Sequence, residues 1–386
     1  MHAAAQPYRD QKRFLWFLSL LIPGISFSGP NLYQLTQSYA VFWLPVVLSY
    51  IIFPLLDLWI GADRSNPPEE IVPQIEADPY YRYITFALAP LLWLGYIGGI
   101  WYFTQHQLPL HVQIAGALTC GGLGGYAINL AHELGHKKSR FERGLARLVL
   151  MMTGYGHFYI EHNHGHHRDV ATPADSASSR MGENIYRFML REMPGGLLRA
   201  WALEKKRLAQ LNLPVWHGQN KILQAAAGTL LIYSLLLLWL GWSALPFMLG
   251  AAFWSNFQLT TANYIEHYGL LRQKDANGRY EICSPRHSWN SNQLLSNWAM
   301  LHLQRHADHH AHPTRRYQSL RHFDDAPQLP NGYFGMFVLA YLPPLWFKVM
   351  DARLLETVGF DARRINFDPK RKQALIQRYQ LDGAGK

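Results

Sequence analysis

The chain has 386 residues, of which 49% are hydrophobic and only 16% are charged, and its formal net charge is +10 at pH 7. A soluble domain carries about 25% charged residues, so this composition argues against a set of ordinary soluble domains. It also excludes a disordered or collagen-like chain. The two cysteines, Cys120 and Cys283, are too few for a disulfide framework or a four-cysteine metal site. The most unusual feature is the presence of 19 histidines.

Three long stretches without a formal charge predict the membrane-spanning part of the chain. They cover residues 14–56, 83–132 and 222–265. One crossing of a bilayer needs about 20 mainly apolar residues, so each stretch is long enough for two crossings joined by a turn. The expected turns are at Ser28–Asn31, Gln105–Pro109 and Gly241–Pro246. The sequence therefore predicts an all-α integral membrane protein with six transmembrane helices in three hairpins.

All 36 lysines and arginines lie outside these stretches, on what would be one side of the membrane. Because basic loops stay in the cytoplasm, we expect both termini and the polar segments 57–82, 133–221 and 266–386 to be cytoplasmic. The prediction is a single domain, 1–386, in the bacterial inner membrane. The positive charge then requires no nucleic acid, and it suits contact with anionic lipid or an acidic protein partner. The run Gly121–Gly125 predicts a close helix–helix contact within the second stretch.

Twelve of the histidines lie in two short windows, 132–167 and 302–312. His132 and His136 are four residues apart and share one face of a helix, so both could bind the same metal ion. This HELGH sequence also fits a zinc protease in which Glu133 would be the base. The segment 161–167 adds three candidates if it is helical, whereas His164 would point away from them.

The remaining candidates lie at the ends of later segments. His267 is at the inner end of the sixth expected helix, and the third cluster is in HADHH, 306–310. One tetrahedral zinc uses four ligands, so a set of this size favours two redox-active metals, and iron suits oxygen chemistry. The nine candidates, all at one membrane depth, are His132, His136, His162, His166, His167, His267, His306, His309 and His310.

These motifs resemble the histidine boxes of the integral-membrane alkane 1-monooxygenases, the bacterial alkane ω-hydroxylases. The resemblance rests on HELGHKK (132–138), EHNHGHHRDVATP (161–173), NYIEHYGLLR (263–272) and LQRHADHHAHPTRRYQSLR (303–321). It extends to NPPEE (66–70), RMGE (180–183) and HSWNSN (287–292), and so covers most of the chain. The wider superfamily includes membrane fatty-acid desaturases and hydroxylases, and the HYG element around His267 is typical of the hydroxylase branch.

The resemblance implies a non-haem diiron site held by those nine histidines in the cytoplasmic cap. It also implies hydroxylation of the terminal C–H bond of medium-chain n-alkanes to 1-alkanols, with O2 as co-substrate. The sequence has no dinucleotide fingerprint after a strand and too few cysteines for rubredoxin, so the electrons must come from outside the chain. The resemblance implies that the donor is a separate rubredoxin, itself reduced by an NAD(P)H-dependent rubredoxin reductase. The alkane would enter from the bilayer.

Metal-bound histidines usually donate their second N–H to a carboxylate or a carbonyl group. The carboxylates available for this role are Glu133, Glu161, Asp169, Glu266 and Asp308. We expect His157, His302 and His312 to support the ligands from nearby or to be structural, and not to bind metal. Strands remain possible around 272–285, where Asp275–Gly278 has the composition of a turn.

Three other functions remain open. A desaturase or a xylene-type hydroxylase of the same superfamily would use the same histidines. An intramembrane zinc protease would use only His132, Glu133 and His136 and would leave seven candidate ligands without a role. A metal transporter would place its ligands near the middle of the bilayer rather than at its edge.

Overall fold

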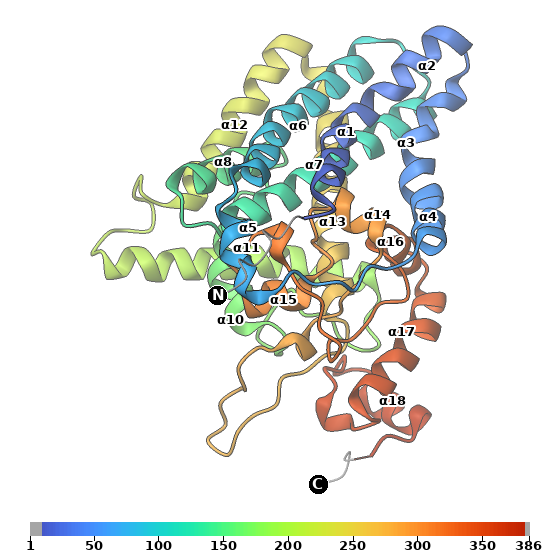
Figure 1. The fold of residues 1–386 in the computed structure, drawn as a ribbon. Helices are drawn as coiled ribbons and strands as arrows, with labels where there is room; N and C mark the ends of the chain where they lie inside the picture. The colour runs from blue at the N-terminus through green and yellow to red at the C-terminus, as the bar shows by residue number, and fades with distance from the viewer. Residues whose placement is uncertain (1–9, 383–386) are drawn as a thin grey trace, which may run out of the picture.

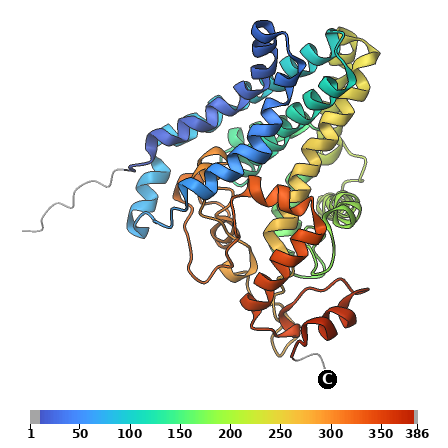
Figure 2. The same cartoon turned by 90° about the vertical axis from the view of Figure 1, so that its right-hand side faces the viewer.

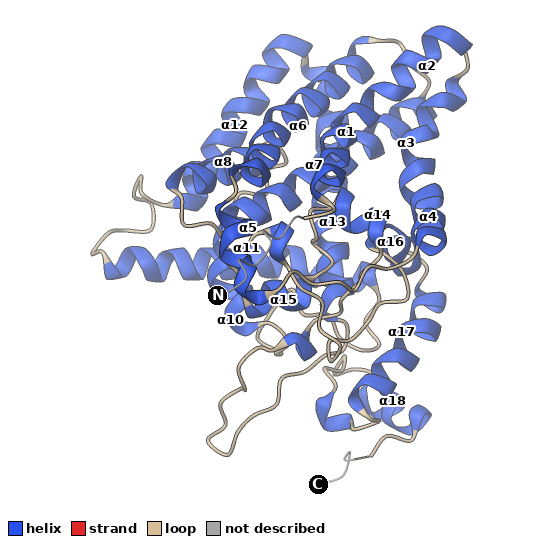
Figure 3. Cartoon of the chain, viewed as in Figure 1, coloured by secondary structure: helices blue, strands red, loops and turns tan. Residues whose placement is uncertain are grey.

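Helices are the regular elements of the computed structural model, which describes residues 10–382. Within these residues the extended segments form only isolated β-bridges, so the predicted all-α class is confirmed (Figure 3). The part of the predicted N-terminal cytoplasmic segment that precedes residue 10 lies outside the described residues.

Within residues 10–382, five helical stretches are long and apolar enough to cross a membrane. They are Arg13–Thr36, Tyr39–Ile60, Pro79–Gln105, Leu110–Gly135 and Lys221–Leu240. The first comprises η1 (Arg13–Phe17), α1 (Leu18–Leu21), η2 (Ile22–Phe27) and α2 (Ser28–Thr36). The second comprises η3 (Tyr39–Trp43), α3 (Leu44–Val47), the π-helix η4 (Leu48–Ile52) and α4 (Phe53–Ile60). The others are α6 (Pro79–Gln105), α7 (Leu110–Gly135) and α12 (Lys221–Leu240).

The sixth predicted span, α13 (Leu245–His267), is a helix of 23 residues but is not among these five. It is less apolar because its second half carries buried polar side chains such as Ser255, Thr260 and Asn263. A further candidate span exists if α16 (Tyr333–Ala340) and α17 (Pro343–Val358), which meet at a bend of 120°, are counted together. Five or six spans therefore agree with the prediction of a multi-pass protein.

The remaining helices lie mostly at one end of the long ones, as the orange and red segments show in Figures 1 and 2. Helix α11 is seen along its axis in Figure 2 and crosses beneath the long helices. These elements are η5 (Glu69–Ile71), α5 (Val72–Ala77), α8 (Arg140–Met151), α9 (Phe158–Glu161), η6 (His162–His166), α10 (His167–Asp169), α11 (Ile185–Gln210), η8 (Pro285–His287), α14 (Leu294–Ala299), α15 (His306–Ala311), η9 (Tyr317–Ser319), η10 (Ala362–Arg364) and α18 (Lys372–Tyr379), with η7 (Trp242–Ala244) at the opposite end.

Two of the three predicted turns are confirmed, and the first is wrong. Helix α6 ends at Gln105 and α7 begins at Leu110, and α12 and α13 are separated at Gly241–Ala244. At Ser28–Asn31, however, the chain stays helical and the turn comes at Gln37, where φ is +53°. Pro30 lies in the first turn of α2, a position at which proline needs no backbone donor and its fixed φ suits the helix.

The segment 272–285 forms no strand and projects from the body as a long loop (Figure 1). The turn predicted at its tip is present, because the Gly278 N–H donates to the Asp275 carbonyl at 3.0 Å and Gly278 has a φ of +74°. Lys274 and Tyr280 form a single antiparallel bridge. An isolated two-stranded hairpin is marginally stable, which explains why the pairing goes no further.

The predicted close helix contact at Gly121–Gly125 is confirmed. These residues lie where α7 packs against α13 at the centre of the molecule (Figure 1). A Cβ atom on Gly124 would lie 2.0 Å from Ser255 Oγ, and one on Gly121 would lie 2.6 Å from Trp254 Cβ. The absence of side chains here lets the two helices that carry His132 and His267 approach closely.

We expect Gly124→Ala to destabilise the protein, because the added methyl group overlaps Ser255 and overpacking costs about 1–3 kcal/mol. Thermal unfolding of the purified protein in detergent measures the effect. Gly122→Ala is the matched control, since a Cβ there meets no atom within 4 Å. Equal melting temperatures for the two variants would contradict the close-contact interpretation.

Candidate metal centre

Nine histidine side chains from four segments of the chain come together where α7 and α13 end. His132 and His136 come from the end of α7, and His267 is the last residue of α13. The others lie on the α9–η6–α10 segment and on α15. The residues brought together are His132, His136, His162, His166, His167, His267, His306, His309 and His310, the same nine that the sequence singled out.

The nine side chains form two separate groups. In each group one ring nitrogen per histidine lies within 4.8 Å of all the others. The five-histidine group consists of His132, His136, His162, His167 and His309. The four-histidine group consists of His166, His267, His306 and His310. The sequence did not reveal this division.

A π-helical turn divides the second histidine motif between the groups. In a regular α-helix His167 would lie about 140° around the axis from His162. Residues 162–166 instead form the π-helix η6, and the His167 N–H donates to the carbonyl of His162, five residues earlier. The two rings therefore meet, with 3.1 Å between their Nε2 atoms, and His166 is directed to the other group. The expectation that His164 points away is met, because it is exposed.

The nitrogen positions fit metal ions. His309 Nε2 lies 3.1 Å from His167 Nε2, and His310 Nε2 lies 2.9 Å from His306 Nε2. Two nitrogens that bind one ion at right angles, each about 2.1 Å away, would be about 3.0 Å apart. The Nε2 atoms of His132, His136, His166 and His267 are buried without a hydrogen-bond partner among residues 10–382, as expected of atoms that serve as ligands.

Burial keeps most of these rings neutral, as metal binding requires. It lowers the pKa of His306, His309 and His310 well below the usual value, and neighbouring histidines lower it further. His166 is the exception, because the nearby Asp175 carboxylate raises its pKa despite the opposing effect of burial. A neutral imidazole has a free lone pair, so the clusters are suited to bind cations rather than protons.

Asp175 contacts a cluster histidine and was missed by the sequence reasoning. Its Oδ2 lies 2.9 Å from His166 Nδ1, and both side chains are buried. Despite burial, His166 and Arg199 hold the pKa of Asp175 well below its usual range. A carboxylate at this nitrogen leaves Nε2 free and fixes the orientation of the ring. Asp175 lies in an irregular loop nine residues after His166, where no spacing rule points to it.

Only one of the five carboxylates expected beside the ligands has a hydrogen-bond or ion-pair contact with one of the nine among the described residues. Glu266 Oε2 lies 3.2 Å from His306 Nε2, and Tyr333 donates a hydrogen bond to the other oxygen of Glu266. The other four pair with cations, namely Glu133 with Lys137, Glu161 and Asp169 with Arg199, and Asp308 with Arg315. These four pairs anchor the segments that carry the histidines.

The three histidines expected to be structural lie outside both groups. His302 is buried, with Nδ1 2.9 Å from the carbonyl of Tyr317. His312 Nδ1 lies 2.8 Å from Asp308, and the ring of His157 packs against Tyr155. The carbonyl of His287, 3.4 Å from Nδ1 of His267, is a further contact that the sequence did not indicate.

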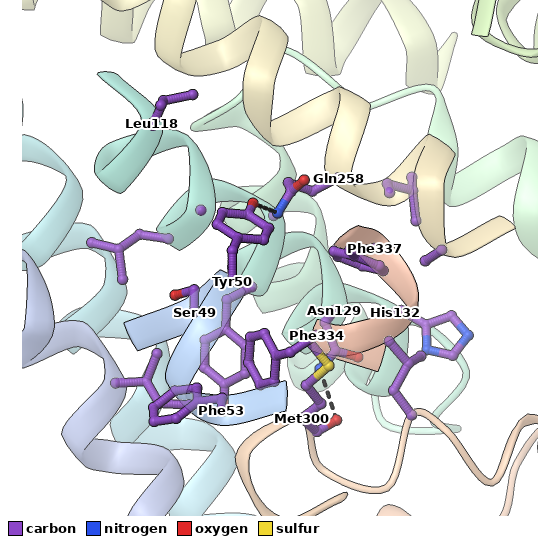
Figure 4. Close-up of a pocket in the computed structure, with 18 of the residues that line it drawn as sticks. Ser49, Tyr50, Phe53, Leu118, Asn129, His132, Gln258, Met300, Phe334 and Phe337 are labelled. Carbon is purple, nitrogen blue, oxygen red and sulfur yellow. Dashed lines mark hydrogen bonds between the residues drawn. The ribbon is translucent and has the colours of Figure 1, made fainter. Parts of the chain in front are cut away.

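An apolar cavity extends from the histidines into the bundle of long helices (Figure 4). His132, His162, His306 and Glu266 line its inner end. Its walls are formed by side chains from the first two spans, α7, α13 and α16, including Ile25, Val46, Phe53, Leu118, Phe334 and Phe337. Gln258 donates to the Tyr50 hydroxyl at 2.5 Å and is one of the few polar groups in the wall.

Comparison with known proteins identifies the family that carries this arrangement. Residues 108–340 match the fatty acid desaturase family. The alkane 1-monooxygenase 1 of Alcanivorax borkumensis is 47% identical over 98% of this chain and 93% of its own length. The alkane 1-monooxygenase of Ectopseudomonas oleovorans is 46% identical over 99% and 95%.

The chain belongs to the alkane 1-monooxygenase family. A more distant relative, the xylene/toluene monooxygenase hydroxylase component of Pseudomonas putida, is 28% identical over 71% of this chain and 74% of its own length.

We expect Asp175→Asn to weaken metal binding by 10–100-fold, the usual effect of removing a partner of a ligating histidine. Metal titration of the metal-free protein measures this change directly. Asp169→Asn is the control, because Asp169 pairs with Arg168 and Arg199 and touches none of the nine histidines. If both variants bind metal as the unaltered protein does, Asp175 does not orient His166.

Proposed function

We propose that this chain is a non-haem diiron monooxygenase that hydroxylates the terminal C–H bond of medium-chain n-alkanes to 1-alkanols. The observation that carries the proposal is the position of the two histidine groups at the inner end of an apolar cavity. Family membership supports the same reaction, since the relatives that match nearly the full chain are named alkane 1-monooxygenases.

One iron would be held by the five-histidine group and the other by the four-histidine group. Structural zinc sites use four ligands, so the five-histidine group exceeds the set that zinc takes, and imidazole ligands also suit iron, which activates O2 when bound. Glu266 lies against His306 Nε2, so its carboxylate is placed to act at the four-histidine group. Asp175 would keep His166 in the neutral tautomer with its lone pair at Nε2.

The cavity would hold the alkane with one end at the histidines. Phe53, Phe334 and Phe337 provide apolar contact without groups that would react, and they exclude water from the chain. An alkane dissolves in the lipid, so a cavity between membrane helices is the direct route for it. The protein would thus orient the terminal carbon at His132 and His306.

The electrons would come from a separate rubredoxin, reduced by an NAD(P)H-dependent rubredoxin reductase. We also propose the topology of six spans, with α13 as the last, in the bacterial inner membrane and with the histidines toward the cytoplasm. The segments 57–82, 133–221 and 266–386 then contain almost all of the basic residues and form the face available to an acidic electron donor and to anionic lipid.

The zinc protease alternative requires Glu133 to be a free base. Glu133 instead forms a buried ion pair with Lys137 at 2.9 Å, and the Tyr317 N–H donates to it. Both histidines of the HELGH motif lie in the five-histidine group. A desaturase would form a double bond and no alcohol, which the first experiment below distinguishes. A xylene-type hydroxylase would form an alcohol from a methyl-substituted aromatic substrate instead of from the alkane.

With reduced rubredoxin, a medium-chain alkane and isotopically labelled O2, the iron-loaded protein should form the primary alcohol with one labelled oxygen atom. Mass spectrometry of the product measures the label. A double bond in the product would indicate a desaturase. Label that enters from water would exclude the monooxygenase reaction.

His166→Ala should lower bound iron below two per chain and abolish hydroxylation, because it removes one member of the four-histidine group. His164→Ala is the matched control two residues away, and it should keep its iron and most of its activity because His164 is exposed. Iron analysis and the alcohol assay are made on both proteins. Equal loss of iron in the two variants would refute the nine-histidine assignment.

A further inference from the structure

A second cavity lies beside the two histidine groups and has a different lining from the apolar one. His162, His166 and Asn263 border it, together with Glu161 and Glu192. Its volume of about 10 Å³ is close to the space that one water molecule requires. His162 and Asn263 line both cavities, so the histidines lie between an apolar space and a polar one.

Glu192, on α11, is a buried carboxylate in this polar cavity, with 4% of its surface exposed. The Thr260 hydroxyl donates to its Oε2 at 2.8 Å, and the Asn263 amide donates to its Oε1 at 3.1 Å. Both donors are neutral groups on α13. A buried carboxylate that is held only by neutral groups is costly to keep ionised.

The charged and titratable groups around Glu192 favour its protonated form. Burial raises its pKa, and the negative Asp175 adds to the shift, although Thr260, Asn263 and Arg191 act in the opposite direction. Arg191 is engaged by Glu183, with 2.9 and 2.8 Å between the paired atoms. Glu161 and Tyr155, which border the same cavity, bring no positive charge to it, and burial lowers the pKa of His157 and His162. His166, the one bordering histidine whose pKa is raised, is paired with Asp175.

The proposed reaction requires protons at the histidines. The balanced reaction is RH + O2 + 2 e⁻ + 2 H⁺ → ROH + H2O, with the electrons supplied by rubredoxin. The lining of the apolar cavity is mainly apolar, with scattered polar groups such as Ser49 and Tyr50, whereas acidic and other titratable side chains make up much of the lining of the polar cavity. His157 Nε2, on a residue that lines the cavity, is buried without a hydrogen-bond partner in the described part of the chain.

We propose that Glu192 supplies protons to the diiron site through this polar cavity. The inference rests on the proposed monooxygenase function. The Glu192 carboxyl group releases its proton toward His162 and His166, for the oxygen atom that leaves as water. The carboxylate then regains a proton from solvent. Glu192 does not bind metal itself. It acts through the cavity, by holding a proton and transferring it to the site.

The test uses Glu192→Gln, which keeps the size of the side chain but holds no acidic proton. In the iron-loaded protein we expect kcat to fall by roughly 100-fold, as for the loss of an acid–base group, with KM for the alkane unchanged. The solvent deuterium isotope effect on kcat should increase, because proton supply becomes limiting. Iron content and thermal unfolding should stay as in the unaltered protein.

A second readout needs neither iron nor turnover. The infrared spectrum of the metal-free protein near neutral pH should lose one protonated-carboxyl band in Glu192→Gln. Glu204→Gln is the matched control on the same helix, because Glu204 is buried but ion-paired with Arg207 at 2.6 Å and should show no such band. An unchanged spectrum in Glu192→Gln would overturn the proposal.

Gly196→Ala provides a variant that leaves Glu192 intact. Gly196 lines the polar cavity, and a Cβ atom built on it meets no atom within 4 Å, so alanine should place a methyl group there without a clash. We expect the same fall in kcat and the same isotope effect. If kcat and the isotope effect are unchanged in both variants, the proposed transfer of protons from Glu192 through the polar cavity is wrong. If the unaltered protein forms no alcohol, the proposed function itself is wrong.

Discussion

The rest of the structure depends on one constraint, the burial of nine imidazole rings that are kept mostly neutral and face one another. Nitrogen lone pairs 2.9–3.1 Å apart repel each other unless a cation or a proton lies between them. Burial disfavours protonation of His309 and His310, and the packed surroundings leave little room for the rings to separate. The arrangement therefore favours bound metal, and other elements must hold the four contributing segments against this repulsion.

Close helix packing and buried ion pairs provide that support. The glycine run Gly121–Gly125 lets α7 and α13 approach closely, and this contact fixes His132 relative to His267. Arg199 pairs with Glu161, Asp169 and Asp175 and so ties the second histidine segment to α11. Buried ion pairs contribute little net stability, but they define one geometry because an unpaired partner would be costly. These ion pairs therefore position the segments that carry the histidines and add little to the overall stability of the fold.

The histidines separate two environments that a hydroxylation of an apolar substrate needs at the same point. On one side lies the cavity lined by Phe53, Phe334 and Phe337, which suits a chain from the lipid. On the other lies the small polar cavity next to Glu192, which suits proton transfer. Helix α13 contributes to both, through Ala262 in the apolar cavity and through Asn263, which lines both cavities and donates to Glu192.

The sequence by itself determined the helical membrane class, two of three turns, the close helix contact at Gly121–Gly125 and the nine histidines, because hydrophobic length and the spacing of residues on a helix are local properties. Only the tertiary structure decided the division into five and four histidines, since that depends on a π-turn at His162–His166 that local periodicity does not reveal. It also decided that Asp175, rather than Asp169, contacts a cluster histidine. Such partners come from irregular loops whose positions are set by packing between distant segments.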